Sequence, residues 1–145
     1  MTTVALGSCV HVLRDDGELD LRPVESLRAG ELVATATGHY ASVVKVIVQR
    51  SRDGTLPLCT VGGLAANAAQ LVQYGSDEWR RIDAFAPAVH QGVRGVACVV
   101  LEGAGSIVVD GVRCVAVNAE RFRATMQAHR AVRLRLGGST FRVLG

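Results

Sequence analysis

The sequence predicts a mainly β fold: one domain of many short antiparallel strands, one helix near the C-terminus and a final hairpin. Short runs rich in β-branched residues follow one another at close spacing, separated by Asp-Gly and Gly-Gly pairs that favour turns. The chain has 145 residues and is 49% hydrophobic, which is enough for one well-buried core. Because no internal repeat, low-complexity tract or linker divides it, residues 1–145 are assigned to a single domain.

The first half of the chain is expected to form hairpins and their connections. Strands are predicted over residues 10–14, 18–21, 32–37, 41–49 and 56–61. Asp15-Asp16-Gly17 and Asp53-Gly54 supply tight reversals between them. Pro23 has no N–H to donate, so it confines its segment to a strand end or an edge. Residues 24–27 are expected to make one helical turn that Gly30 ends.

The segment from Gly62 to Val72 is ambiguous on local grounds. Gly62-Gly63 indicates a break or a bulge after the preceding strand. Residues 64–70 are rich in alanine and favour a helix, but the segment is short and the strand-like residues 71–74 follow it. A full helix is therefore not expected here.

The second half is expected to continue with strands and to end in a helix and a hairpin. Strands are predicted over residues 79–82, 93–102, 106–109 and 112–117, with a loop over 87–92. Asp110-Gly111 fits a two-residue type I′ turn. Asn118 is expected to cap a helix through about Ala131, with Phe122, Met126 and His129 on one face. Residues 132–145 then read as the final hairpin, with arginines outward and leucines inward.

Charge is small overall but unevenly placed, since the formal net charge is +3 while the C-terminal end is strongly basic. From residue 121 onward there is no acidic residue and there are six arginines: Arg121, Arg123, Arg130, Arg133, Arg135 and Arg142. This segment could contact an acidic protein partner, or its arginines could simply solvate the outer side of the last elements. Phe122 and Phe141 are the only Phe, Tyr or Trp residues in this segment, too few for a stacking platform, so nucleic-acid binding is not favoured.

Neither a membrane segment nor a metal or cofactor site is expected. No apolar run approaches the roughly 20 residues of a spanning helix, and residues 1–12 lack the features of a secretory signal. A soluble domain is therefore expected, with its compartment and oligomeric state left open. The cysteines Cys9, Cys59, Cys98 and Cys114 and the histidines His11, His39, His90 and His129 show no zinc-ligand spacing, and buried free thiols are the expected state for the last three cysteines.

Three sequence blocks occur in a familiar order and spacing. Residues 4–33 give a strand, a DG turn, a leucine before glycine, and an acidic residue followed by valine. Residues 58–79 place a Gly-Leu pair before an apolar strand and a tryptophan. Residues 96–120 contain a Val-Leu strand and an apolar hairpin with a cysteine. Together, from residue 3 to about 120, they resemble a self-processing domain of the Hint superfamily, which includes hedgehog proteins and inteins, and are most similar to its Vint branch.

The resemblance implies autoproteolytic acyl-shift chemistry. In this family a cysteine at the domain's first residue attacks the preceding carbonyl, and a Thr-x-x-His pair polarises and protonates the bond so that the amine can leave. The nucleophile position falls on Thr3 or on Ala5, depending on the alignment. The Thr and His of the pair fall on Asn67 and Gln70, and the terminal histidine of the third block falls on Ala119. Because the motif residues are replaced, the resemblance implies a scaffold that is inactive or weakly active.

Two catalytic alternatives stay open. Cys9 could serve as a displaced nucleophile, although it lies within the first predicted strand and too close to the following turn for the family spacing. Thr3 could attack through its hydroxyl while Asn67 and Gln70 hold the carbonyl, but unassisted threonine is a poor nucleophile at neutral pH.

Two other interpretations need no catalysis. The fold could be a non-catalytic protein-interaction module that binds its own precursor or another protein through the arginine-rich C-terminal face. The replacements could also be deliberate substitutions that trap an unprocessed form, which alanine at Ala5 and Ala119 would suit. Asn118 could be a self-cyclising asparagine in the intein manner, yet a helix cap is the expected role.

Overall fold

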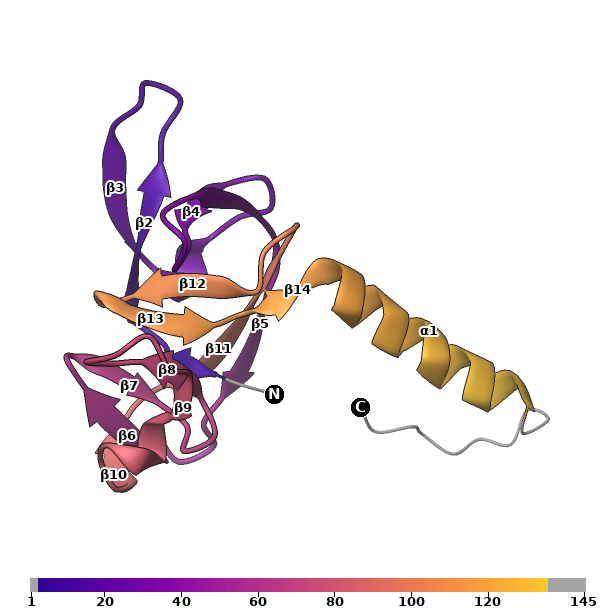
Figure 1. Cartoon of the computed structure of the whole chain (residues 1–145). Helices are drawn as coiled ribbons and strands as arrows, with labels where there is room; N and C mark the ends of the chain where they lie inside the picture. Colours follow the sequence, from indigo (N-terminus) through magenta and orange to yellow (C-terminus); the bar gives the residue numbers. More distant parts are fainter. Residues whose placement is uncertain (1–2, 136–145) are drawn as a thin grey trace.

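The computed structural model describes the backbone of residues 3–135 and the side chains of residues 3–128. Three helical segments are present in this part of the chain: η1 (Val24–Ser26), η2 (Ile82–Ala84) and α1 (Ala119–Arg135). The strands, labelled in Figure 1, are β1 (Val4–Ala5), β2 (Cys9–Leu13), β3 (Leu19–Pro23), β4 (Leu32–Ala34), β5 (Tyr40–Arg50), β6 (Thr55–Val61), β7 (Leu64–Ala66), β8 (Leu71–Gln73), β9 (Arg80–Arg81), β10 (Val89–Gly92), β11 (Gly95–Leu101), β12 (Ser106–Val109), β13 (Val112–Val115) and β14 (Val117–Asn118).

Two sheets account for all of these strands. A ten-stranded sheet has the order β10-β6-β7-β1-β11-β5-β4-β2-β3, with β14 pairing β11 in parallel, and a four-stranded sheet has the order β12-β13-β8-β9. The long strand β5 pairs β4 through residues 40–42 and β11 through residues 43–50. It thus connects the β2–β3 hairpin at one end of the molecule with β6, β7 and β10 at the other (Figure 1). The predicted mainly β fold is confirmed.

The core consists of small aliphatic side chains, as expected for closely stacked strands. All seven residues of β11 are buried, so this strand is covered on both faces, whereas β2 alternates buried and accessible side chains. The predicted burial of the thiols of Cys59, Cys98 and Cys114 is confirmed. The largest fully buried aliphatic side chains are Leu58, Leu64, Ile82, Leu101, Val10, Val24, Val33, Val43, Val72, Val100 and Val109.

Two hairpins are closed by two-residue turns with positive φ at both positions. Asp110 and Gly111 have φ of 48° and 76° between the paired residues Val109 and Val112, which confirms the predicted type I′ turn. Gly62-Gly63, with φ of 54° and 92°, joins β6 to β7 in the same way, so this pair is a hairpin turn rather than a bulge. A Cβ on Gly62 would also lie 3.1 Å from the ring of Tyr74, which leaves little room for a side chain.

Tertiary pairing overrides local sequence at two places. The alanine-rich segment 64–70 contains no helix: β7 ends at Ala66, and a turn follows in which the Gln70 N–H donates to the Asn67 carbonyl at 3.0 Å. The predicted loop over 87–92 is wrong, because Val89–Gly92 forms β10 along β6. Pro87 and Gly92 are typical of loops, but the edge of β6 supplies the hydrogen-bonding partner that the local sequence cannot show.

The chain leaves the sheets through helix α1. The Asn118 side-chain oxygen accepts the Glu120 N–H at 2.9 Å, which confirms the predicted cap. The first turns are held by an Arg123–Glu102 ion pair at 3.0 Å and by the Lys45 ammonium 4.5 Å from the Phe122 ring centroid. Residues 123–128 are exposed, and Figure 1 shows the helix extending away from the sheets.

The predicted final hairpin is wrong in its first arm. Residues 132–135 belong to α1, because arginine and leucine favour a helix when no neighbouring strand is available to pair with. The second arm and the side chain of His129 lie outside the described residues. No helix in the described part of the chain combines the length and apolarity needed to cross a membrane.

Candidate functional site

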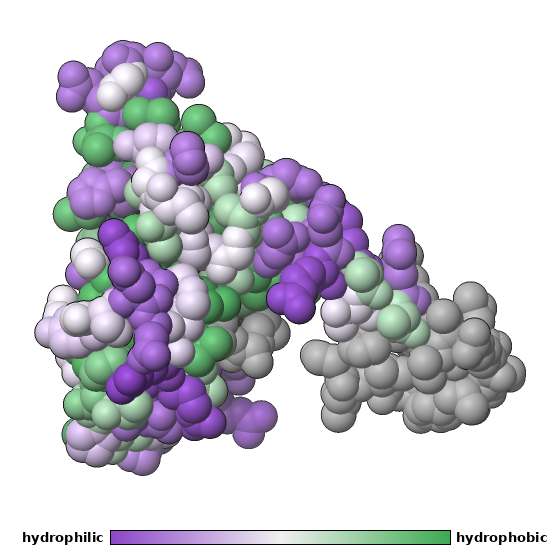
Figure 2. Space-filling view, viewed as in Figure 1, coloured by the Kyte–Doolittle hydropathy of each residue, from purple (hydrophilic) through white to green (hydrophobic). Residues whose placement is uncertain are grey.

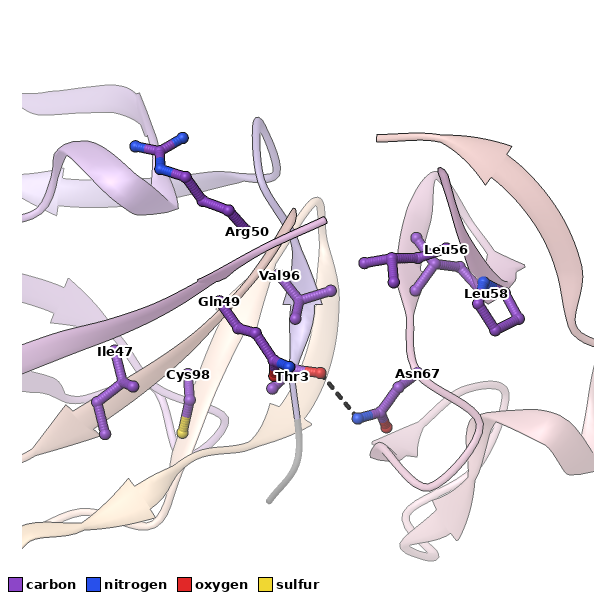
Figure 3. Close-up of a pocket in the computed structure, with 10 residues that line it drawn as sticks. Thr3, Ile47, Gln49, Arg50, Leu56, Leu58, Asn67, Val96 and Cys98 are labelled. Carbon is purple, nitrogen blue, oxygen red and sulfur yellow. Dashed lines mark hydrogen bonds between the residues drawn. The ribbon is translucent and has the colours of Figure 1, made fainter. Parts of the chain in front are cut away.

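Thr3 and Asn67 form the centre of the candidate site. Thr3 directly precedes β1, which pairs with β7 on one side and β11 on the other. The Asn67 side-chain amide donates to the Thr3 hydroxyl oxygen at 2.7 Å, and the Asn67 backbone N–H donates to the Thr3 carbonyl at 3.2 Å. The turn after β7 fixes the asparagine, because its side-chain oxygen accepts the Ala69 N–H at 3.2 Å. The structure therefore brings together two of the predicted site residues (Figure 3).

A pocket of 370 Å³ opens beside this pair. Its walls are largely apolar, from β5 and β11 on one side and β6 on the other (Figure 3). The described residues that line it are Thr3, Ile47, Gln49, Arg50, Leu56, Pro57, Leu58, Asn67, Val96 and Cys98. Arg50 and Cys98 are the only titratable groups in this lining. An arginine stays protonated at any physiological pH, so it supplies no general base.

Gln70 is a structural cross-link between β8 and β13. Its side chain is 1% exposed, and its amide nitrogen donates to the carbonyls of Leu71 and Val115, each at 3.0 Å. Its own backbone carbonyl accepts the Ile82 N–H at 2.8 Å. A glutamine amide has no proton to exchange near neutral pH, and here both of its donor bonds are committed to main-chain carbonyls. The Gln70 N–H donates to the Asn67 carbonyl at 3.0 Å, so the backbone links these two residues.

Ala5, Cys9 and Ala119 do not line the Thr3 pocket. Ala5 lies inside the sheet, paired with Val96, and Ala119 is the buried first residue of α1. Cys9 begins β2, where its N–H donates to the Asp110 side chain at 3.0 Å and its carbonyl accepts the Asp110 N–H at 2.9 Å. These two bonds fasten the start of β2 to the β12–β13 turn.

Cys98 is the pocket residue that sequence reasoning missed as a site residue. Val4 pairs with Ala97 and Ala5 with Val96, so the antiparallel register continues to place Thr3 opposite Cys98. Burial raises the pKa of the Cys98 thiol, which keeps it protonated and weakly nucleophilic. Only the register identifies this cysteine, because nothing in the sequence relates residue 98 to residue 3.

Comparison with known proteins was made at three levels. The chain matches no protein-family profile and no curated protein sequence. Among solved structures it is similar to a DnaB intein from Synechocystis sp. PCC 6803, with 18% identity and a TM-score of 0.54 over 79% of this chain and 98% of that one. It is also similar to the gp41-1 intein, with 13% identity and a TM-score of 0.54 over 79% and 98%. An Ssp DnaB mini-intein variant gives 18% identity and a TM-score of 0.56 over 80% and 95%.

These similarities identify the architecture. Each intein is covered almost completely, so the shared part is the whole intein fold and not a local motif. The chain therefore has the Hint fold in which inteins are built, as the sequence resemblance implied. The unmatched fifth of the chain is about as long as the segment from Ala119 to the C-terminus.

Proposed function

We propose that this protein is a Hint-type self-processing scaffold, closest to the Vint branch, in which the autoproteolytic acyl shift is lost or weak. The similarity to inteins over their full length supports the scaffold. The geometry at Thr3 is the observation that supports the loss: its hydroxyl accepts a hydrogen bond from an asparagine amide where the chemistry needs a base. The described members of the core all precede α1 apart from Ala119, in keeping with a single domain.

The acyl shift requires two proton transfers, and each needs a side chain that can accept or donate a proton. In an N-to-O acyl shift the Thr3 oxygen would bond to the preceding carbonyl carbon while the bond from that carbon to the Thr3 nitrogen breaks. The hydroxyl proton must leave and the nitrogen must gain a proton. The Asn67 amide can donate a hydrogen bond but cannot accept the hydroxyl proton near neutral pH, and Gln70 is turned toward two main-chain carbonyls. Neither residue can perform the proton transfers.

The test is a fusion that carries a folded tag upstream of Thr3. It is incubated with dithiothreitol or hydroxylamine, and the intact mass is measured over time. We expect no release of the tag from the natural sequence, or release so slow that Thr3→Ala barely changes it. Fast release that Thr3→Ala abolishes would show an active site and contradict the proposal. A Cys9→Ala fusion serves as control, because Cys9 lies outside the pocket.

A second candidate function is a non-catalytic protein-interaction module. The observation that favours it is α1, whose residues 123–128 are exposed and which extends away from the sheets (Figure 1). The helix carries five arginines against one glutamate, Glu120, so an acidic protein surface is the partner it suits. Five of the six arginines of the predicted segment thus belong to a helix and not to a hairpin.

This second function predicts that the positive charge on α1 controls binding of the acidic protein partner. In an Arg133→Glu, Arg135→Glu variant, binding to an acidic protein should fall at low salt and lose its dependence on ionic strength. Surface plasmon resonance against an acidic and a matched neutral protein measures both effects. Equal binding by the variant and the natural protein would rule out this face.

A further inference from the structure

Strand β3 forms an open edge with an unusual exposed surface. It is the last strand of the ten-stranded sheet and pairs only with β2 among the described strands. Leu19 and Leu21 are 49% and 62% exposed, and Leu21 is the most exposed large aliphatic side chain in the described part of the chain. The half-buried positions of the same strand are instead the charged residues Asp20 and Arg22. Normally the exposed side of an antiparallel strand is the polar one.

The main-chain groups of the two leucines point toward the open edge. The Arg14 N–H donates to the Glu18 carbonyl at 2.8 Å, which marks residues 14 and 18 as a hydrogen-bonded pair. Such pairs alternate with non-bonded ones in an antiparallel ladder, so Asp20 and Arg22 bond to β2. Leu19 and Leu21 therefore direct their N–H and C=O groups away from β2. Pro23 is the next residue whose main-chain groups face the open edge, and because it has no N–H it presents only its C=O there.

The sheet face that carries the two leucines is apolar beyond β3. Register places Leu13 beside Leu19 and His11 beside Leu21, and Leu32 of β4 follows beside Leu13. No acidic or basic side chain other than His11 belongs to this face of β2, β3 and β4 among the described residues. In Figure 2, hydrophobic residues gather below the hydrophilic tip of the β2–β3 hairpin.

The edge lacks most features that prevent strand addition. Protected edges usually carry lysine, a bulge, a proline within the strand or inward-pointing charges, and of these β3 has only the inward-pointing Asp20 and Arg22. Strand β3 has no lysine, its register with β2 runs without a shift, and its proline is the last residue. A straight five-residue edge with two exposed leucines is thus open to a further strand.

We propose that β3 pairs antiparallel with β3 of a second copy of this chain, so that the protein is a dimer with a continuous sheet. Placing Leu21 opposite Leu21 of the second copy lets these two residues exchange both main-chain hydrogen bonds. The Leu19 N–H of each copy then meets the Pro23 carbonyl of the other. That carbonyl already accepts the Ser26 hydroxyl at 2.7 Å and begins the 3₁₀ turn of η1, so it would be shared between the two copies. The two outward N–H groups of β3, those of Leu19 and Leu21, each face a carbonyl of the other copy in this arrangement.

Charge favours a second copy and fixes the register. With Leu21 opposite itself, Asp20 of each copy lies opposite Arg22 of the other, which gives two pairs of opposite charge. The Arg22 guanidinium also contacts Glu31 and Ser26 of its own copy. Sliding the strands to bring Leu19 opposite Leu21 would place Asp20 opposite Asp20, and like charges directly opposite destabilise a sheet. One strand therefore presents both an apolar row and a charge row that are complementary to themselves, as a twofold interface requires.

The test is the mass of the full chain in solution, measured by sedimentation from about 1 μM to about 1 mM, the range in which moderate to weak complexes dissociate. We expect a dimer that Leu21→Lys converts to a monomer. Val89→Lys is the matched control, because Val89 is a 58% exposed aliphatic residue on β10, the opposite edge of the same sheet. This control should remain dimeric. Circular dichroism confirms that each variant is folded.

A second pair of variants tests the register. Asp16 and Asp20 both contact Arg14, at 3.0 Å and 3.5 Å, but only Asp20 lies within β3. Asp20→Lys should therefore weaken the dimer at least tenfold, whereas Asp16→Lys should leave it unchanged. Amide exchange at Leu19 and Leu21 should slow as the protein concentration rises. A monomer at every concentration, or a dimer that survives both Leu21→Lys and Asp20→Lys, would overturn the proposal.

Discussion

Thr3 and Asn67 form a contact that supports the fold, although the sequence resemblance aligned them with a nucleophile and an activating residue. Two hydrogen bonds, at 2.7 Å and 3.2 Å, tie the residue before β1 to the turn after β7. Asn67 is itself held by the Ala69 N–H. These bonds orient Thr3 without providing a group that can take its proton. At the scale of single residues, the contact between Thr3 and Asn67 contains neither a general acid nor a general base.

Gln70 gives the most direct test of this structural role. Replacing Gln70 by alanine would remove the hydrogen bonds that its buried amide donates to the part-buried carbonyls of Leu71 and Val115, at a cost of about 1–3 kcal/mol. Urea denaturation should show this loss in the free energy of unfolding. Gln73→Ala is the matched control, because Gln73 donates to the Asp77 carbonyl in an exposed contact. Its effect should stay within about 0.5 kcal/mol. Equal stability of the two variants would contradict the role assigned to Gln70.

The sequence pointed to part of this site. Aligning the blocks placed Thr3, Asn67 and Gln70 in relation to one another, and the structure links all three through hydrogen bonds. The structure also separates Cys9 from these three residues, because the Cys9 backbone is hydrogen-bonded to Asp110. Cys98 could not be found, since its position opposite Thr3 depends on the pairing of β1 with β11. Strand register over such a sequence distance is set by tertiary packing and not by local residue preference.

At the scale of elements, the stability of α1 depends on its first residues more than the stability of a helix packed along its whole length would. Most of its length is free of the sheets, and isolated helices of this length are marginal in water. Asn118→Ala removes the acceptor for the Glu120 N–H and should destabilise the helix by roughly 1 kcal/mol. The helical signal in far-UV circular dichroism should fall accordingly.

Asn118→Asp provides the control for this prediction. An aspartate can accept the same N–H and places a negative charge at the helix N-terminus, so the helical signal should be kept or increased. Loss of signal in both variants would show that Asn118 acts through its pairing in β14 and not as a cap.

Elements with strong local signals were predictable from sequence. The turn at Asp110-Gly111 needs positive φ at both positions, and the β-branched run of β5 gave a strand within one residue of the observed ends. The wrong predictions concern segments whose structure depends on whether a neighbouring strand is available to pair with them. Strand β10 forms because β6 offers it an edge, and residues 132–135 are helical because no strand stands beside them. Local propensity carries no information about such neighbours.

At the scale of the whole molecule, the Hint fold gives the scattered site residues a common place. Strand β1 lies between β7 and β11, so the start of the domain, the turn after β7 and the third sequence block meet at one pocket. That meeting is a property of the topology and does not depend on which residues occupy these positions. A scaffold of this kind should regain processing when its motif residues are restored.

The most direct measurement is therefore the intact mass of a tagged precursor with the substitutions Thr3→Cys, Asn67→Thr and Gln70→His. Our account predicts that dithiothreitol releases the upstream tag from this variant, that Gln70→Ala in place of Gln70→His prevents release, and that the natural sequence releases none. If the restored precursor folds, as judged by circular dichroism, and still releases no tag, the proposal of a self-processing scaffold is contradicted.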